Sequence, residues 1–208
     1  MRSYIALALI FSAVVVSGCT QNSVSPEGEE GSFELMISDQ PTAIDNFDYV
    51  NTSFSEVRVF YQNDSANSTE NESFETIQLD DNPTVDLTQV KGDRAISILE
   101  ENLEAGNYTG VHLKVANVSA SINNESAEVN VPSERLKINK EFEIAANATT
   151  QFVFDINVVQ RGQTGVYNLL PVISESGVAG KDVEVEEVER GNSTNSSSQR
   201  PETPSASQ

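Results

Sequence analysis

The stretch Gln151-Phe152-Val153-Phe154-Asp155-Ile156-Asn157-Val158 places a large apolar side chain at every second position from Phe152 to Val158. A period of two is the signature of a β-strand with one face toward a core, because successive side chains of a strand point to opposite faces of the sheet. This run therefore predicts a strand and indicates an all-β protein.

The same period recurs from Phe33 to about Val188, which predicts one domain of ordinary size over residues 33–188. Many short strands with polar alternate positions are typical of an antiparallel β-sandwich, of the immunoglobulin or transthyretin kind, in which each sheet is wet on one face. The other alternating patterns are Phe33-x-Leu35-x-Ile37, Val50-x-Thr52-x-Phe54, Val57-x-Val59-x-Tyr61, Ile77-x-Leu79, Val85-x-Leu87, Val111-x-Leu113-x-Val115, Val118-x-Ala120-x-Ile122, Val129-x-Val131, Leu136-x-Ile138, Phe142-x-Ile144, Tyr167-x-Leu169 with Ile173, and Val183-x-Val185.

Local departures from this period predict irregularities. The apolar residues switch from even to odd positions between Phe54 and Val57, and from odd to even positions near Ala116-Asn117. Each switch indicates a β-bulge in its strand. Residues 95–104 carry apolar side chains at helical spacing, so one short helix is expected there, with a strand over residues 96–99 as the alternative.

The amino terminus has the layout of an export signal. Residues 1–18 begin with a charged Arg2, continue as an apolar run and end in Ser17 and Gly18, just before Cys19. The run is too short for a spanning helix, and a cysteine at this place matches the lipobox of exported lipoproteins. We therefore expect cleavage before Cys19 and lipidation of its thiol, the alternatives being an ordinary signal peptide with an incidental cysteine and an uncleaved anchor.

Two polar segments flank the domain. Residues 19–32 are rich in Gly, Glu and Ser without periodicity, which predicts a flexible spacer behind the lipid. Residues 189–208 are rich in Ser and Thr and almost free of apolar side chains, which predicts a disordered tail. Cys19 is then the expected membrane attachment.

The chain is strongly acidic, with 12 Lys+Arg against 32 Asp+Glu and a formal net charge of −20. Nucleic acid and anionic lipid surfaces repel such a domain, so neither is an expected partner. At about 1 M salt the Debye length falls to roughly 3 Å and most of the self-repulsion disappears. The acidity, together with the absence of Trp, favours a halophile's extracellular protein, while an acidic surface kept for solubility is the alternative.

A family resemblance covers roughly residues 32–177. The segments 38–47 and 103–111, with Val85-Asp86-Leu87 and Tyr167-x-Leu169-x-Pro171-Val172, occur in the order typical of the DUF4382 family of bacterial and archaeal lipoproteins, which is plentiful in halophilic archaea. The family's common Asp-Ala-Pro stands here as Asp39-Gln40-Pro41, and Phe74 stands where a Trp is frequent. The resemblance implies a β-sandwich of a cell-surface lipoprotein, with no established activity and no catalytic residues to transfer.

Two of these segments have a structural interpretation of their own. Pro41 ends the first strand and Asp39 is expected to cap the exit turn through its carboxylate. The pattern Leu103-x-x-Gly106-x-Tyr108 resembles a tyrosine corner, in which the phenol hydrogen-bonds to the backbone of the preceding turn.

Catalytic patterns are scarce in this chain. His112 is the only histidine and shares a strand face with Lys114, and no spacing singles out a nucleophile and carboxylate to complete a triad. The mature chain offers too few His and Cys for a transition-metal site, and it has no glycine-rich phosphate loop. We therefore expect no enzymatic activity.

The chain is rich in carboxylates, whose oxygen atoms are the ligands that calcium prefers, so calcium is the one cofactor that we consider. Asp39, Asp45 and Asp48 fall in one loop, and Asp80, Asp81 and Asp86 fall in another, although neither loop matches an EF-hand. The first loop is the better candidate for a calcium site, while chance clustering in so acidic a chain is the alternative.

N-glycosylation sequons exceed the roughly four expected by chance from the Asn, Ser and Thr content. Several of them are expected to carry glycans, the alternative being that polar composition generates most of them. The sequons lie at Asn51, Asn63, Asn67, Asn71, Asn107, Asn117, Asn124, Asn147, Asn192 and Asn195.

These features predict a non-catalytic, lipid-anchored, N-glycosylated protein on the extracellular face of the cell membrane. It would act as an interaction or envelope-structural module toward other envelope proteins or surface glycans. The alternative is a ligand-binding lipoprotein for carbohydrate or calcium that serves a transporter or sensor. Its mark would be a concave site lined by aromatic side chains such as those of Tyr49, Tyr61 and Tyr167.

Overall fold

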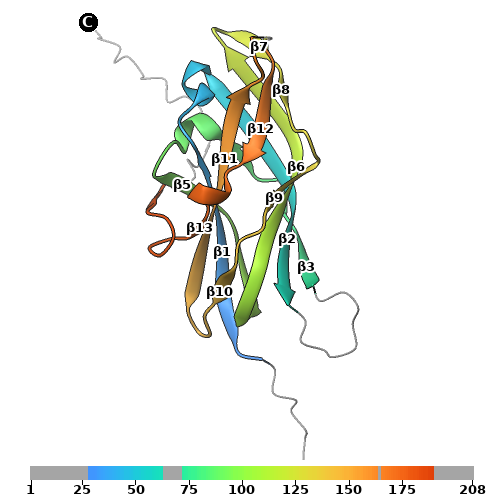
Figure 1. The fold of residues 1–208 in the computed structure, drawn as a ribbon, viewed down its shortest axis with the longest axis vertical. Helices are drawn as coiled ribbons and strands as arrows, with labels where there is room; N and C mark the ends of the chain where they lie inside the picture. The colour runs from blue at the N-terminus through green and yellow to red at the C-terminus, as the bar shows by residue number, and fades with distance from the viewer. Residues whose placement is uncertain (1–27, 63–71, 164, 190–208) are drawn as a thin grey trace, which may run out of the picture.

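Two β-sheets pack face to face in the computed structural model, which describes residues 28–62, 72–163 and 165–189 (Figure 1). The expected all-β sandwich is confirmed. In the described part of the chain, the helices are three 3-10 turns, and no helix is long and apolar enough to cross a membrane. The turns are η1 Ala43–Asn46, η2 Leu87–Gln89 and η3 Ile173–Glu175.

The first sheet contains β1 Glu30–Asp39, β5 Arg94–Glu104, β8 Val129–Asn130, β11 Thr149–Gln160, β12 Tyr167–Pro171, β13 Gly177–Val178 and β14 Glu186–Glu187. Its order is β14-β5-β1-β11-β12-β8, and β13 also pairs with β11. The central strands β1 and β11 run parallel, with Leu35 opposite Phe152 and Ile37 opposite Phe154. This sheet is therefore mixed and not purely antiparallel, because the chain crosses to the second sheet before it returns as β11.

The second sheet contains β2 Tyr49–Gln62, β3 Glu72–Gln78, β4 Thr84–Asp86, β6 Gly106–Ile122, β7 Glu125–Ala127, β9 Arg135–Ile138 and β10 Phe142–Ile144. Its order is β10-β6-β2-β3, with β4 on β2 and with β7 and β9 on β6, and all of these pairings are antiparallel. The long strands β2 and β6 form its centre.

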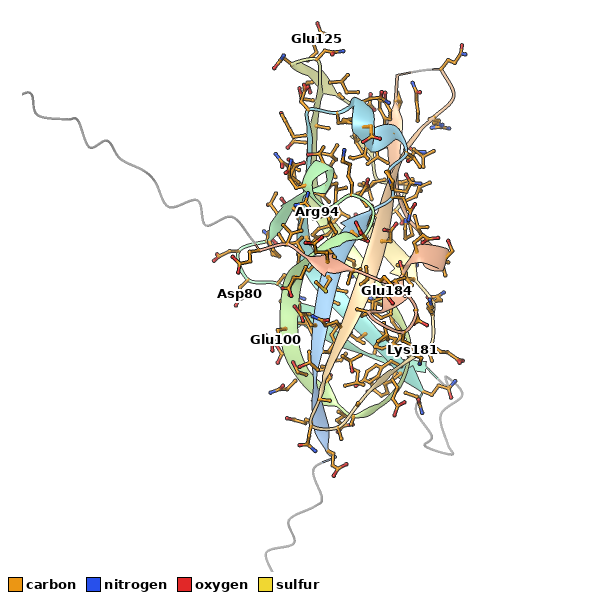
Figure 2. All side chains as sticks on the ribbon, turned by 90° about the vertical axis from the view of Figure 1, so that its left-hand side faces the viewer. Asp80, Arg94, Glu100, Glu125, Lys181 and Glu184 are labelled. Carbon is orange, nitrogen blue, oxygen red and sulfur yellow. The ribbon has the colours of Figure 1, made fainter. Side chains whose placement is uncertain are left out.

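Residues 177–188 form a strap across the outer face of the first sheet. The strap begins on β11 as β13 and ends on β5 as β14, and Figure 2 labels Lys181 and Glu184 on it. It covers a small apolar cluster of Met36, Ala95 and Val153. The expectation that this face is wet is therefore wrong beneath the strap. The predicted strand at residues 183–185 is also wrong, because this segment makes a single bridge there, between Ala179 and Val183.

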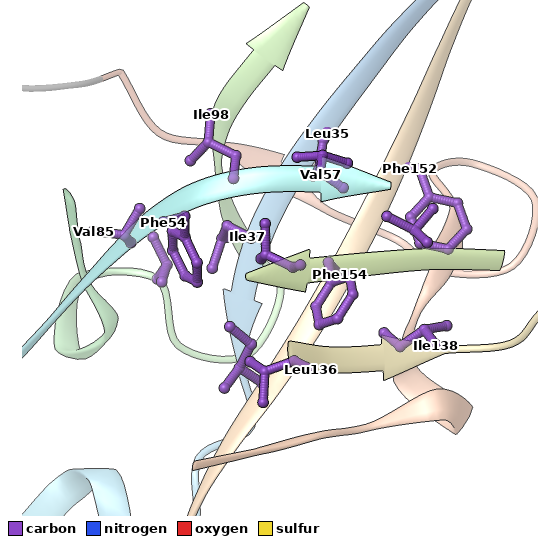
Figure 3. Packing of buried hydrophobic residues seen from close by; sticks show 14 of the residues in the cluster. Leu35, Ile37, Phe54, Val57, Val85, Ile98, Leu136, Ile138, Phe152 and Phe154 are labelled. Carbon is purple, nitrogen blue, oxygen red and sulfur yellow. The ribbon is translucent and has the colours of Figure 1, made fainter. Parts of the chain in front are cut away.

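The core lies between the two sheets and is built from the side chains that the period of two predicted. Figure 3 shows Leu35, Ile37, Phe152 and Phe154 of the first sheet packed against side chains of the second. Aromatic rings fill one end, where the Phe142 ring centroid lies 4.7 Å from that of Phe152. Each fully buried side chain of this size contributes roughly 1.5–3 kcal/mol, so the inward-facing half of each strand stabilises the sandwich.

Both predicted bulges are confirmed, and they face each other. The register between β2 and β6 shifts around Phe54, which pairs with Val115, while its neighbour Ser53 pairs with Asn117. Ala116 is therefore the extra residue of β6. A bulge in each strand keeps apolar residues on the core side on both sides of the break.

The helix expected over residues 95–104 is wrong, because β5 is a strand along its whole length. Leu35 pairs with Leu99 and Ile37 pairs with Ile96, so both residues of β5 face the core although they are three positions apart. The cause is a register shift that leaves Ile98 as an extra residue. The bulge therefore spaces two core-facing residues of a strand three positions apart, which is the spacing expected of a helix.

The sandwich also begins earlier than expected. Residues 30–32, which were assigned to the spacer, are the first residues of β1 and pair with residues 102–104 of β5. Their polar composition hid the strand, since they lie at the end of the sheet where little core remains to be covered.

Candidate functional site

The outer face of the second sheet carries a concentration of cationic and aromatic side chains, which we call the basic face. Its members come from β2, β3, β6 and β9, which are separated by up to about 80 residues in the sequence. The basic face consists of Glu56, Arg58, Phe60, Phe74, His112, Lys114, Arg135 and Lys137.

Strand register places these side chains in rows. Arg58 of β2 lies opposite His112 of β6, which lies opposite Lys137 of β9. In the next row, Lys114 lies between Glu56 and Arg135. Directly opposite residues of antiparallel strands share one face of the sheet, so the alternation that buries one face presents these residues together on the other.

A partly buried ion network lies at the centre of the basic face. Glu56 Oε1 accepts hydrogen bonds from Arg58 Nε at 2.8 Å and from Arg135 Nη2 at 2.7 Å. Although burial opposes ionisation of Glu56, hydrogen bonds from Gln78, Arg135 and Arg58 hold its pKa below the ordinary value. The charged carboxylate thus holds two guanidinium groups in place. Nη1 of Arg135 is buried beside it without a hydrogen-bond partner.

An aromatic group continues the surface beside this network. The Phe60 ring lies 5.2 Å from that of Phe74 and 4.2 Å from that of His112, between ring centroids. Arg58 Cζ lies 4.8 Å from the centroid of the Phe74 ring, within cation–π range. Phe74 is 46% exposed, so a large apolar surface stands open to solvent next to a positive charge.

The sign of the charge sets this surface apart from the rest of the protein. Four Lys or Arg side chains accompany one carboxylate on the basic face, whereas the whole chain carries a net charge of −20. Aromatic and Arg side chains are enriched at the energetic centres of protein interfaces. The arrangement can therefore recognise an acidic surface.

The three carboxylates of the expected calcium loop have separate environments. Asp45 accepts a hydrogen bond from Lys91 Nζ at 2.7 Å, while Asp48 Oδ2 accepts from Ser121 Oγ and from the backbone of Asn124. Within the described residues, no three His, Cys, Asp or Glu side chains lie close enough together to hold a metal ion directly. In the second acidic loop, Asp86 caps η2 through Thr88.

Asp39 differs from both of these, because it is fully buried at the end of β1. Neither of its carboxyl oxygens has a hydrogen-bond partner, so the expectation that it caps the exit turn is wrong. Burial, aided by the charge of Asp155 and opposed by that of Lys91, raises the pKa of Asp39 to about 8. At neutral pH the side chain is therefore mainly a neutral carboxylic acid.

Other predicted devices and residues are found where expected. The Tyr108 hydroxyl donates to the carbonyl oxygen of Glu104, which confirms the tyrosine corner. His112 lies on the same outer face as Lys114, where its Nε2 is 3.0 Å from Asn139 Oδ1.

The described sequons differ in accessibility. Asn51 is half-buried in β2, between β4 and β6, and is the poorest acceptor. The exposed ones are Asn107, Asn117, Asn124 and Asn147. Cys19 and the sequons at Asn63, Asn67, Asn71, Asn192 and Asn195 lie outside the described residues.

The tyrosines named for a concave site do not converge. Tyr167 is buried against Phe47, and Tyr49 is 38% exposed near the opposite end of β2 from Tyr61. Of the three, Tyr61 lines a cavity of about 650 Å³, which lies at the end of the sandwich where β1 begins. Its other lining residues are Glu30, Gln62, Glu75, Asn102, Leu103, Glu104, Ala105, Gly106, Asn107 and Tyr108.

Sequence reasoning singled out His112 and Lys114 but missed the basic face as a whole. Its residues are scattered through four strands, so no local cluster of charge marks them. A usable signal existed, because Arg58, Lys114, Arg135 and Lys137 all occupy outward positions of predicted strands in a chain with few cations.

Comparison with known proteins gives one match. The model of a family described as a domain of unknown function, DUF4382, covers residues 30–171, which is more than half of the chain. The search of curated proteins and the search of solved structures found no match. The matched residues run from the start of β1 to the end of β12, so they contain the second sheet, the first sheet apart from β13 and β14, and the entire basic face. The chain therefore belongs to the DUF4382 family.

Proposed function

We propose that this chain is a non-catalytic, lipid-anchored protein of the outer cell surface that docks an acidic partner protein through the basic face. The observation that carries the proposal is the reversal of charge on that face in a chain with a net charge of −20. Complementary charge would steer the partner, and the exposed Phe74 beside Arg58 would supply the apolar centre of the interface.

The shape of the face favours a protein over a small ligand. The basic face lies on the regular β2, β3, β6 and β9 ladder, whose neighbouring strands are about 4.8 Å apart, so the side chains form an extended layer. Such a layer suits the roughly 800 Å² that each partner buries in a standard protein interface. A glycan rich in acidic groups is the competing occupant, and the experiment below separates the two.

The anchoring proposal fits the direction in which the chain enters the sandwich. β1 begins at one end, beside Glu104 and Asn147, and the β6–β7 turn with Asn124 lies at the other end (Figure 1). A lipidated Cys19 would lie 11 Cα-to-Cα steps before Glu30, a span of at most about 40 Å. The basic face would then stand at the side of the domain, open to a neighbour in the envelope.

The docking experiment is crosslinking on intact cells in their native salt. The double variant Lys114→Glu/Lys137→Glu reverses charge on the basic face and keeps Glu56, Arg58 and Arg135, while Arg94→Glu/Lys181→Glu reverses exposed cations elsewhere. We expect the wild type and the second variant to crosslink to the same partner through an acidic segment of that partner, and the first variant to lose it. Retention by the first variant contradicts the proposal, as does capture of polysaccharide in place of protein.

The membrane and glycan proposals have tests of their own. A Cys19→Ser variant should be shed into the medium, and its retention in the membrane fraction would contradict lipid anchoring. Intact glycopeptide mass spectrometry should find glycan on the exposed Asn107, Asn117, Asn124 or Asn147. Unmodified peptides at all four would contradict a glycosylated domain.

The ligand-binding alternative is supported by the end cavity, whose volume lies in the range of small-molecule sites. Tyr61 supplies an aromatic wall, and Glu30, Glu75 and Glu104 supply acceptors for sugar hydroxyls. Titration of the purified chain with neutral monosaccharides tests this alternative. A saturable signal that Tyr61→Ala removes would favour it, while the basic-face variants should leave that signal unchanged.

A further inference from the structure

A second concave site lies between the strap and the first sheet, on the opposite side of the sandwich from the basic face. It is a cavity of about 330 Å³ lined by residues of β1, of β11 and of the strap, on which Figure 2 labels Glu184. Five of its lining residues carry carboxylates and none is Lys or Arg. The lining residues are Ser38, Gln40, Gly92, Asp93, Val153, Asp155, Glu175, Asp182, Val183, Glu184 and Val185.

Asp155 is the buried member of this acidic lining, with an exposed fraction of 1%. Its Oδ2 accepts a hydrogen bond of 2.6 Å from Ser38 Oγ, on the neighbouring strand. Its Oδ1 is fully buried and has no hydrogen-bond partner. A buried carboxylate oxygen left unsatisfied is costly, so this atom is placed to accept a ligand.

Nearby hydroxyl donors cannot supply the missing contact. Ser38 already donates to Oδ2 of Asp155. Ser176 Oγ donates to the carbonyl oxygen of Val172 at 2.7 Å and accepts from the backbone N–H of Asp155. Both hydroxyl protons beside Asp155 are thus committed, and the other acidic residues of the pocket lining offer no donor to Oδ1 when they are ionised.

Glu175, an exposed residue of η3, is the carboxylate of this lining whose charge acts on Asp155. Burial raises the pKa of Asp155 to about 7, the hydrogen bond from Ser38 opposes the rise, and the charge of Glu175 adds to it. The two carboxylates repel each other, and a cation between them would attract both and offset that repulsion.

The remaining acids are less available. Asp182 lies 3.9 Å from Lys140 Nζ and accepts from the backbone N–H of Val178. Lys140 itself donates to the carbonyl oxygen of Ser176 at 2.5 Å, so its charge holds the strap at the rim. Asp93 and Glu184 are exposed and contribute a diffuse negative field.

We propose that this acidic pocket binds a partly hydrated calcium ion, with Asp155 and Glu175 as its carboxylate ligands. Calcium prefers oxygen ligands and tolerates water in its coordination shell, which suits a site with two protein carboxylates and no preformed cluster of three. The ion would tie η3, which carries Glu175, to β11 and so fasten the start of the strap. The site is distinct from the loop of Asp39, Asp45 and Asp48 and does not depend on the docking proposal.

Calorimetric titration of the full chain with CaCl₂, in 0.5 M NaCl to screen diffuse attraction, tests the proposal. We expect one site with a Kd of roughly 0.1–1 mM, the range of weak extracellular calcium modules. Asp155→Asn and Glu175→Gln should each weaken binding at least tenfold. Asp80→Asn, which removes an exposed carboxylate elsewhere, should leave it unchanged.

Hydrogen exchange supplies an independent measurement. Calcium should slow exchange of the Ser176 and Val178 amides, whose hydrogen bonds hold the start of the strap, and should do so in the wild type but not in Asp155→Asn. Absence of a saturable heat overturns the proposal. It is equally overturned by binding that Asp155→Asn and Glu175→Gln leave intact, or by strap protection that does not respond to calcium.

Discussion

The Tyr108 hydroxyl donates a hydrogen bond of 2.7 Å to the carbonyl oxygen of Glu104, four residues earlier in the chain. Between them the chain turns from β5 in the first sheet to β6 in the second. The Tyr108 ring also packs on Phe142, with the centroids 5.4 Å apart, so one side chain joins the corner to the core. At this corner the chain passes from the first sheet directly to the second.

Tyr108→Phe should destabilise the protein by about 1 kcal/mol, because the partly buried hydrogen bond to the carbonyl oxygen of Glu104 is lost while the ring packing remains. Urea denaturation of the purified chain measures the loss. Tyr49→Phe, at a half-exposed tyrosine near the other end of β2, is the matched control and should change little. Equal effects of the two substitutions would contradict a structural role for the corner.

Gly31→Ala should be strongly destabilising, by roughly 1–3 kcal/mol as for other overpacked positions. A Cβ at Gly31 would lie 2.2 Å from the carbonyl oxygen of Ala145, and backbone cannot move aside cheaply. At Gly28 the nearest atom to such a Cβ is the flexible side chain of Glu104 at 3.8 Å, so Gly28→Ala is the control. Thermal unfolding that fails to distinguish the two variants would show that β1 does not pack closely at residue 31.

Asp39→Asn should stabilise the protein at pH 8 and have little effect near pH 4. The pKa of Asp39 is about 8 in the folded state and near 3.8 when unfolded, so the folded state holds a proton that the unfolded state releases. Stability is therefore lost as pH rises from about 4 to 8, by an amount on the order of a few kcal/mol. The neutral amide removes this dependence.

Urea denaturation of wild type and Asp39→Asn at several pH values between 4 and 8 measures the difference. Asp80→Asn serves as the exposed control and should run parallel to the wild type. A constant difference between Asp39→Asn and the wild type at every pH would mean that Asp39 does not titrate in this range.

Glu56→Gln should destabilise the protein at neutral pH, because Arg58 and Arg135 lose the carboxylate that pairs both of them. The loss of a partly buried charged partner is worth about 1–3 kcal/mol. Since hydrogen bonds hold the pKa of Glu56 below its ordinary value, this stabilisation is present above the unfolded pKa and disappears as pH falls through the folded one. The variant and wild type should therefore converge in acid.

The same variant also examines the basic face. Loss of the carboxylate frees both guanidinium groups to change rotamer, so the crosslinked partner should be held less specifically although the face becomes more positive. Retention of stability at neutral pH, measured by urea denaturation, would show that the network contributes nothing to the fold.

Sequence periodicity predicted the sandwich because most of its strands bury one face. The parity breaks near Phe54 and Ala116 located both bulges of the central β2·β6 pair, and the spacing of Leu103, Gly106 and Tyr108 located the corner. The same reasoning failed in β5, because the extra Ile98 gave a strand the spacing of a helix. Local patterns describe a strand well until its register shifts.

Sites were harder to predict than strands. Asp39, read as a turn cap, is a buried neutral acid, and Asp155, read only as a polar position of the central strand, lines the acidic pocket. Nothing in the sequence near either residue distinguishes it from the many exposed acids. Burial of a carboxyl depends on what the rest of the chain places beside it. Residues 90–92 lie beside Asp39, whereas Ser38, Ser176 and the strap lie around Asp155.

By itself, the sequence determined the class of fold, the bulges, the corner and the family, because all of these follow from residue spacing within a strand or turn. Only the tertiary structure decided that β1 and β11 are parallel, that residues 177–188 cover the first sheet, and that Arg58, Lys114 and Arg135 share one face. Pairing between distant strands depends on the register and order of the whole sheet, and a single strand's pattern does not contain that information.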